Sequence, residues 1–209
     1  MLIDNIFIIN LESRKDRKNE MINEMKKQNI TNFEFFKAIK PTIEDVYKWN
    51  KKFCIETPRD GYQIGCLGCL KSHLEVIKIS LKRGYNNVLI LEDDTEFVRN
   101  YNELFNDLNE INNSFDMFYL AGSHIGNKIP ITNNVMKIIG TYTTGSYVIN
   151  KKAMEFFINN IEGYNKEVDV FFGKELQPRF NCYASINKIT KQREGFSDIQ
   201  QTNVKYELK

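Results

Sequence analysis

The sequence predicts an α/β protein of one domain, residues 1–209, with an open, mostly parallel and twisted sheet flanked by helices. Residues 4–10, DNIFIIN, are β-branched and aromatic, as in a buried first strand. The apolar run NVLIL at 87–91 is typical of a strand in a sheet that is covered on both faces. Strand-like and helix-like segments alternate between and after these two runs, which favours parallel strands joined by helices.

The first half of the chain contains most of this alternation. A helix with an apolar stripe follows the first strand, and residues 33–39 are the next strand candidate. Residues 40–64, interrupted by prolines and glycine, are predicted to form a short helix and a loop. A helix over 65–83 is indicated by apolar residues at spacings of four, three and four, namely Leu70, Leu74, Ile77 and Leu81.

The second half continues the pattern with shorter elements. We expect a helix around 99–112, a strand at 115–122 and two short strands within 136–150. A short helix at 151–161 and a last strand at 182–190 complete the predicted sheet. Between them, the apolar segment 167–176 contains one acid, Asp169.

Composition excludes several classes of protein. A hydrophobic content of 42% and an aromatic content of 12% argue against disorder. The net charge of +2 gives no field of the kind that attracts nucleic acid. No apolar run approaches the roughly 20 residues that span a bilayer, and the N-terminus lacks a basic leader. We therefore expect a soluble, cytoplasmic protein without a transmembrane segment, with peripheral association at a membrane left open.

The four cysteines are Cys54, Cys66, Cys69 and Cys182. Cys66 and Cys69 form a C-x-x-C pair, but a zinc site built on such a pair needs a second pair at similar spacing, and the sequence has none. A redox pair would follow a strand and open a helix in a thioredoxin-like unit, which is not evident. We predict reduced, buried thiols on a helix.

An acidic cluster, Glu92, Asp93 and Asp94, directly follows the apolar run at 87–91. Ligands of open α/β sheets bind at the carboxyl ends of strands, and carboxylates there suit Mg²⁺ or Mn²⁺. On an extended segment Glu92 and Asp94 would point to the same side. The alternative is an acidic turn at a strand end. The sequence has no P-loop, no G-x-G-x-x-G after the first strand and no G-x-S-x-G.

A second polar group follows the first strand. Asn10 ends that strand, and Arg14 and Arg17 lie three apart on the first helical turn. Their side chains and the free N–H groups of the turn can meet phosphates. An ordinary solvated basic face is the alternative.

Four segments in this order, FIINLESRKDR, GCLKSH, LILEDD and QREGFSDI, resemble glycosyltransferase family 25, the lipooligosaccharide-type and collagen-type β-galactosyltransferases. The resemblance runs from about Ile6 to about Ile199. It implies a GT-A-like fold and a UDP-sugar donor, usually UDP-galactose. It also implies Mn²⁺ or Mg²⁺, inversion at the anomeric carbon, and a glycan or hydroxylysine-type acceptor.

The resemblance also suggests roles for individual residues. Asp94 and Glu92 would hold the metal. Asp169, an acid within an apolar stretch, is the first choice for the general base, and Asp198 is the second choice or an additional metal ligand. Donor-binding positions would be Asn10, Leu11, Arg14, Arg17, Ser72, His73, Asp93 and Gln192.

Several alternatives stay open at this level. The donor could be a glucose or N-acetylglucosamine nucleotide used by the same fold. A sugar nucleotidyltransferase also needs acid and metal, but it usually has a glycine-rich phosphate loop near the N-terminus, which this chain lacks. A non-catalytic glycan-binding remnant of the fold is disfavoured by the intact acidic cluster.

Overall fold

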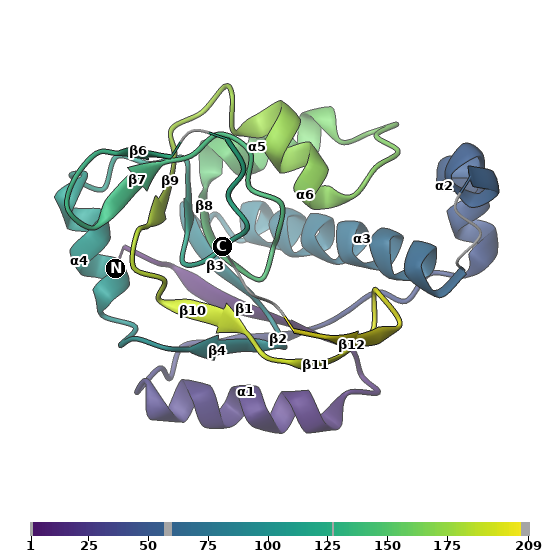
Figure 1. Ribbon diagram of the computed structural model, residues 1–209, viewed down its shortest axis with the longest axis horizontal. Helices are drawn as coiled ribbons and strands as arrows, with labels where there is room; N and C mark the ends of the chain where they lie inside the picture. The colour runs from purple at the N-terminus through teal and green to yellow at the C-terminus, as the bar shows by residue number, and fades with distance from the viewer. Residues whose placement is uncertain (1, 57–59, 127, 206–209) are drawn as a thin grey trace.

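A computed structural model describes residues 2–56, 60–126 and 128–205, with side chains from 51 to 56 and at 60 left undescribed. Its centre is an eight-stranded sheet in the order β2-β1-β3-β8-β5-β9-β7-β6 (Figure 1). These strands are β1 Asn5–Asn10, β2 Glu34–Lys37, β3 Asn87–Glu92, β5 Met117–Tyr119, β6 Ile129–Pro130, β7 Val135–Lys137, β8 Ser146–Asn150 and β9 Cys182–Ser185.

Strand directions confirm the predicted sheet. β1 is parallel to both β2 and β3, and β5 is parallel to β9. β8 lies antiparallel between β3 and β5, with Leu91 opposite Ser146. The carboxyl ends of β1 and β3 therefore meet at one edge, where Ile9 is opposite Glu92.

The helices cover both faces of the sheet. The segments are α1 Lys15–Lys27, α2 Ile43–Glu56 with a kink at Asn50, α3 Asp60–Lys82, α4 Glu103–Glu110, α5 Lys151–Asn160, α6 Val168–Phe171 and the π-helix η1 Phe172–Leu176. In Figure 1, α1 lies below the sheet, while α3, α5 and α6 lie above it.

The two faces have separate hydrophobic cores because side chains alternate along each strand. Phe7 and Ile90 pack in one core with residues of α3, α5 and α6. Ile8 and Leu89 pack in the other core with residues of α1 and α4. Burial on both faces explains why β1 and β3 are continuous apolar runs instead of alternating ones.

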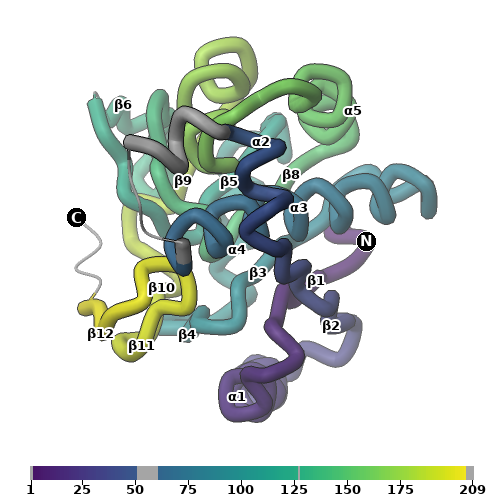
Figure 2. Tube along the Cα trace, turned by 90° about the vertical axis from the view of Figure 1, so that its right-hand side faces the viewer, coloured from purple at the N-terminus to yellow at the C-terminus, as the bar shows by residue number. Residues whose placement is uncertain are grey.

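Two small antiparallel pairs extend the structure beside the carboxyl ends of β1 and β3. β4 Thr95–Phe97 follows β3 after a turn and pairs with β10 Thr190–Gln192, which puts Gln192 opposite Thr95. β11 Gly195–Ser197 and β12 Thr202–Val204 form a hairpin. The hairpin packs tightly on α3, since a Cβ on Gly65 would lie 2.7 Å from the Ile199 Cα. Figure 2 places β10, β11 and β12 together on one side of the sheet.

The main differences from the predicted elements are in two segments. Residues 40–64, predicted as a short helix and a loop, instead contain the 14-residue α2 and the start of α3, which begins at Asp60 rather than at 65; Pro58 lies outside the described residues. The predicted last strand, 182–190, is divided between β9 in the main sheet and β10 in a separate pair.

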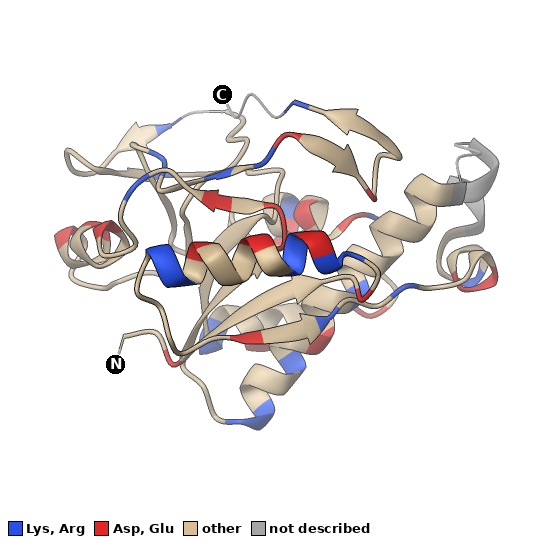
Figure 3. Ribbon diagram, turned by 90° about the horizontal axis from the view of Figure 1, so that it is seen from below, with Lys and Arg blue, Asp and Glu red and all other residues tan. Residues whose placement is uncertain are grey.

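The helices show the mixed charge and moderate hydropathy that the composition predicts. Acidic residues lie between the basic residues at the two ends of α1, so the helix presents charges of both signs (Figure 3). Within the described parts of the chain, every helix is too short or too polar to cross a membrane.

Candidate active site

Three consecutive carboxylates lie where β3 ends. Glu92 is the last residue of the strand, and Asp93 and Asp94 form the turn that leads into β4. The expected alternation of side chains therefore applies only as far as Glu92, because a turn does not preserve the period of an extended strand. Both aspartates instead lie within reach of Arg17.

Asp93 is held by two residues from the β1–α1 segment. Arg17 Nη1 donates to Asp93 Oδ1 at 2.7 Å, and Asn10 Nδ2 donates to Asp93 Oδ2 at 2.8 Å. Burial raises the pKa of Asp93 above its ordinary value, even though the hydrogen bond from Arg17 lowers it. Both oxygens of this carboxylate are thus occupied by donors of the chain.

Asp94 is the carboxylate with unused bonding capacity. Its Oδ2 lies 3.6 Å from Arg17 Nη1, but its Oδ1 is buried and has no hydrogen-bond partner among the described residues. Burial, and secondly the charge of Glu92, raises the pKa of Asp94 to about 7. A buried carboxylate oxygen without a donor is costly, and a hard cation would satisfy it.

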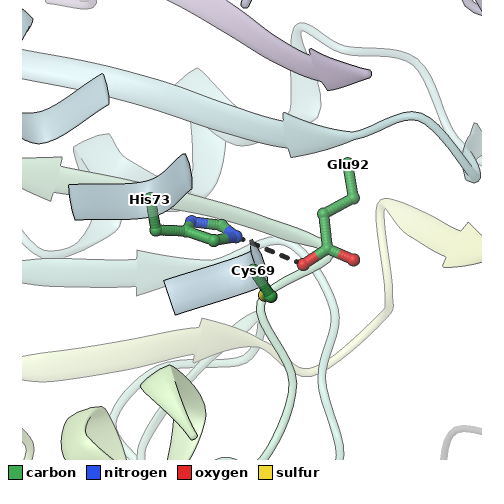
Figure 4. Close-up of side chains that lie close together, drawn as sticks. All are labelled: Cys69, His73 and Glu92. Carbon is green, nitrogen blue, oxygen red and sulfur yellow. Dashed lines mark hydrogen bonds and ion pairs between the residues drawn. The ribbon is translucent and has the colours of Figure 1, made fainter. Parts of the chain in front are cut away.

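Glu92 faces the α3 side of the sheet. His73 Nε2 lies 3.3 Å from Glu92 Oε1 (Figure 4), and Thr144 Oγ1 donates to the same oxygen at 2.6 Å. Burial by itself raises the pKa of Glu92, but the hydrogen bonds from His73 and Thr144 and the charge of Arg17 leave it lowered. His73 Nδ1 is in turn 2.7 Å from the Tyr147 hydroxyl.

Two arginines at the start of α1 bond the β11–β12 hairpin. Arg14 forms an ion pair with Asp198, and it also pairs with Asp16 at 2.9 Å. Arg17 Nη2 donates to the Phe196 carbonyl at 2.8 Å. These bonds hold Asp198 beside the turn of the acidic cluster.

We name the cavity beside this turn the arginine cavity, which has a volume of about 350 Å³. It collects most of the predicted site residues from segments that are far apart in the sequence. The predicted residues in its lining are Leu11, Arg17, Ser72, His73, Glu92, Asp93, Asp94, Gln192 and Asp198. Asn10 and Arg14 are not part of the lining, but each bonds one of its acids, Asp93 and Asp198 respectively.

Ser72 has a structural set of contacts. Its Oγ donates to the Gly68 carbonyl at 2.7 Å and accepts from the Ile39 N–H at 2.8 Å. The hydroxyl therefore links α3 to the segment that follows β2 by hydrogen bonds.

A second cavity, the Asp169 cavity, has a volume of about 340 Å³. Glu167, Asp169 and Tyr142 are among its lining residues. Asp169 Oδ1 accepts from the Val170 N–H at 2.8 Å. Burial, and secondly the charges of Glu167 and Glu92, raises the pKa of Asp169 to about 6.

The two cavities adjoin. Cys69, Glu92, Gln192 and Ile199 line both of them. Gln192 Oε1 is buried and has no hydrogen-bond partner among the described residues. A molecule in one cavity is therefore separated from a molecule in the other only by this shared wall.

Sequence reasoning missed two polar neighbours of Glu92. Thr144 is not among the predicted site residues, yet it bonds Glu92; Tyr147 is not among them either, and it bonds His73, the neighbour of Glu92. The signal available in the sequence was the polar content of the segment preceding β8, since β8 pairs with β3.

An open α/β sheet with acids at the carboxyl end of a strand, beside arginines at a helix start, is the arrangement expected of an enzyme that binds phosphorylated ligands. The family model for glycosyltransferase family 25, described as LPS biosynthesis protein, matches residues 3–172. The chain belongs to this family, as its sequence motifs predicted, and its sheet with helices on both faces confirms the GT-A-like fold expected from them.

Curated relatives are similar at low identity. Procollagen galactosyltransferase 2 of Mus musculus is 26% identical over 172 residues, covering 74% of this chain and 27% of the relative. Putative glycosyltransferase R655 of Acanthamoeba polyphaga mimivirus is 27% identical over 175 residues, covering 74% of this chain and 52% of the relative. The chain thus spans between about a quarter and a half of these relatives' lengths.

Proposed function

We propose that this chain transfers a hexose from a UDP-sugar to a hydroxyl group of a glycan or hydroxylysine-type acceptor, with inversion at the anomeric carbon. The observation that carries the proposal is the pair of adjoining cavities. One contains arginine and a buried carboxylate oxygen that has no donor in the described parts of the chain, and the other contains a carboxylate whose pKa is raised to about 6. Galactose is the first choice of sugar, because the family and the name of the mouse relative both point to it.

The residues of the arginine cavity fit a hard divalent cation. Asp94 would hold Mn²⁺ or Mg²⁺ through its unpartnered Oδ1, with Glu92 as the second ligand. When bound, the metal would offset the negative charge of a diphosphate leaving group. Asp93 is a weaker candidate ligand because Arg17 and Asn10 occupy its oxygens.

Arg17 would bind the donor's diphosphate, and Arg14 would position the β11–β12 hairpin. A guanidinium presents a planar fork of donors that matches phosphate oxygens. Arg17 already sits in the arginine cavity and bonds Asp93, so it can keep Asp93 in place while offering its remaining N–H groups. Arg14 acts through its pair with Asp198, positioning the hairpin beside the bound donor.

Asp169 would act as the general base. A base is effective when its pKa lies near the working pH, and burial raises that of Asp169 from its ordinary range toward neutrality. In the proposed reaction, the acceptor hydroxyl occupies the Asp169 cavity and gives its proton to Asp169 while its oxygen attacks the anomeric carbon. The bond from that carbon to the diphosphate oxygen breaks on the opposite side, which inverts the configuration. Asp198 is the second choice for the base, but it already forms an ion pair with Arg14.

The test is turnover with a panel of donors. The protein would be incubated with UDP-galactose, UDP-glucose or UDP-N-acetylglucosamine, each with Mn²⁺ and with acceptors of both proposed classes. We expect release of UDP to be fastest with UDP-galactose and to fall when a chelator is added. Absence of UDP release with every donor and acceptor would contradict the proposal and favour a binding remnant.

A further inference from the structure

Cys69, His73 and Glu92 converge on one point beside the shared wall of the two cavities, to which Cys69 and Glu92 belong (Figure 4). The Cys69 sulfur, a ring nitrogen of His73 and a carboxylate oxygen of Glu92 all lie within 4.8 Å of one another. Cys69 and His73 are four residues apart on α3, so helix periodicity puts both side chains on the same face. Glu92 reaches the same point from the end of β3.

From this convergence we infer a second metal site, in which Cys69, His73 and Glu92 bind a borderline-soft divalent cation of the zinc type. Glu92 is also the second ligand of the magnesium or manganese site proposed at Asp94, so its Oε1, the oxygen that faces His73, would serve this site and its other oxygen the site at Asp94. The remaining ligands, a thiol and an imidazole here and a carboxylate there, separate the two sites chemically. Thiolate and imidazole ligands suit Zn²⁺, whereas sites made only of oxygen ligands suit Mg²⁺ or Mn²⁺. Two ligands at i and i+4 of one helix are also the arrangement of the helical H-E-x-x-H zinc motif.

The geometry requires only small movements. Zinc bonds of about 2.3 Å to sulfur and about 2.0–2.2 Å to nitrogen and oxygen put ligand atoms about 3.3–3.8 Å apart in a tetrahedron. His73 Nε2 and Glu92 Oε1 are already 3.3 Å apart. The sulfur, which lies within 4.8 Å of both, would approach by a side-chain rotation.

The three side chains have hydrogen-bonding neighbours of the kind that orient metal ligands. A zinc-binding histidine usually directs its other ring nitrogen to a hydrogen-bond partner, which fixes the ring. Here the Tyr147 hydroxyl lies 2.7 Å from His73 Nδ1, and the ring is almost fully buried. With the metal bound, Nδ1–H would donate to the Tyr147 hydroxyl and the Nε2 lone pair would bind the metal, which replaces the hydrogen bond that His73 donates to Glu92. Thr144 donates to Glu92 and lies 3.8 Å from the Cys69 sulfur.

The site would keep an open coordination position. Three protein ligands leave one tetrahedral position for water or another molecule. Cys69 and Glu92 line both cavities, so this position is reachable from either of them. Binding converts the Cys69 thiol to a thiolate and releases its proton to solvent, while His73 binds as the neutral imidazole. The expectation from C-x-x-C spacing did not cover this arrangement, because its second ligand is a histidine four residues after Cys69.

Cobalt(II) is a suitable probe, because a Co²⁺–thiolate bond gives a charge-transfer band and tetrahedral Co²⁺ absorbs strongly in the visible. We expect the purified protein to show both features with one equivalent of Co²⁺ and to lose them when one equivalent of Zn²⁺ is added. Cys69→Ser should abolish the charge-transfer band and weaken zinc binding by at least about 100-fold. Cys66→Ser is the matched control, since Cys66 is a free, buried thiol three residues earlier on the same helix, and it should leave the band unchanged.

Two further variants separate this site from the proposed transferase function. Asp94→Asn should retain the cobalt spectrum, because Asp94 is not one of the three ligands. The spectrum therefore tests the zinc-type site even if the proposed sugar transfer is wrong. Tyr147→Phe should weaken zinc binding by about 10–100-fold while the band persists at saturating Co²⁺.

Unmodified protein gives an independent measurement. Zinc should slow alkylation of Cys69 by a small reagent and leave the rate at Cys66 unchanged, as read from peptide masses. A wild-type protein without a charge-transfer band, a band that survives in Cys69→Ser, or equal alkylation with and without zinc would each overturn the inference.

Discussion

The arginine cavity and the Asp169 cavity share a wall, but the carboxylates in them have different hydrogen-bond donors. In the arginine cavity, Asp93 receives donors from Arg17 and Asn10, and Asp198 pairs with Arg14. The described lining of the Asp169 cavity contains no lysine or arginine, and the donor to Asp169 Oδ1 is a neighbouring backbone N–H. The difference teaches that one cavity is built to handle negative charge and the other to hold a carboxylate that readily takes a proton.

Asp94 is the exception within the arginine cavity. It lies next to Asp93 in the chain, yet one of its oxygens has no partner among the described residues and its pKa is raised to about 7. Adjacent aspartates thus differ because Arg17 can approach one of them at 2.7 Å and the other only at 3.6 Å. The comparison of the cavities can be tested by removing one group at a time.

The largest expected effect comes from the Asp169 cavity. Asp169→Asn removes the proposed base but keeps the size of the side chain, so kcat should fall by about 10²–10⁴-fold. UDP binding in the arginine cavity should be unchanged, as measured by calorimetry. Glu167→Gln is the matched control, because Glu167 lines the same cavity two residues earlier, and it should retain most of the activity. A fully active Asp169→Asn protein would remove Asp169 from the mechanism.

The next effect belongs to the arginine cavity. Asp94→Asn should weaken Mn²⁺-dependent UDP binding by about 100-fold or more, because the proposed metal loses its main ligand. Calorimetric titration of UDP with and without Mn²⁺ measures this, and the melting temperature checks the fold. If the dependence on Mn²⁺ survives unchanged, the metal is held elsewhere.

A pH profile addresses the raised pKa of Asp169 directly. Asp169 accepts a proton only when ionised, so at saturating Mn²⁺ the value of kcat/KM should fall about tenfold per pH unit below about 6 and level off above it. The folded-state pKa lies above the ordinary value of 3.8, so ionisation of Asp169 destabilises the fold as pH rises from 3.8 through 6. Asp169→Asn should therefore be more stable than the wild type above pH 6. A profile that stays flat down to pH 4.5 would contradict this assignment.

The smallest effect concerns stability. Arg17→Ala leaves Asp93 buried with Asn10 as its remaining side-chain donor among the described residues, so the free energy of unfolding should fall by about 2–4 kcal/mol in urea titrations. Arg83→Ala breaks the ion pair of Arg83 with Glu34, and should cost much less because both side chains are exposed to solvent. Equal losses in the two variants would show that the Arg17–Asp93 pair does not stabilise the arginine cavity.

Much of the sheet could be predicted because its strands carry a local signal. β1 and β3 are continuous apolar runs, and burial on both faces requires such runs wherever they occur. β10 and the β11–β12 hairpin could not be predicted from such runs. They are three residues long and half exposed, and their pairing with β4 and their packing on α3 depend on contacts between distant parts of the chain.

The candidate site likewise has one part that the sequence predicts and one part that depends on packing. The acids after β3 and the arginines after β1 could be recognised because the edge where parallel strands end is fixed by the order of strands and helices. The convergence of Cys69, His73 and Glu92 could not, because it depends on how α3 is rotated against β3. Periodicity puts Cys69 and His73 on one face of a helix but does not say which residue that face meets.

By itself, the sequence determined the α/β class, the family motifs and the residue types available for phosphate and metal. Those properties follow from hydrophobic periodicity and local composition, which act over a few residues. Only the tertiary structure decided that Arg17 bonds Asp93, and that one Asp94 oxygen has no partner among the described residues. It also decided that Asp169 lines a cavity that shares a wall with the arginine cavity. Hydrogen bonds and pKa values depend on distances of a few ångströms between side chains, and packing alone sets those distances.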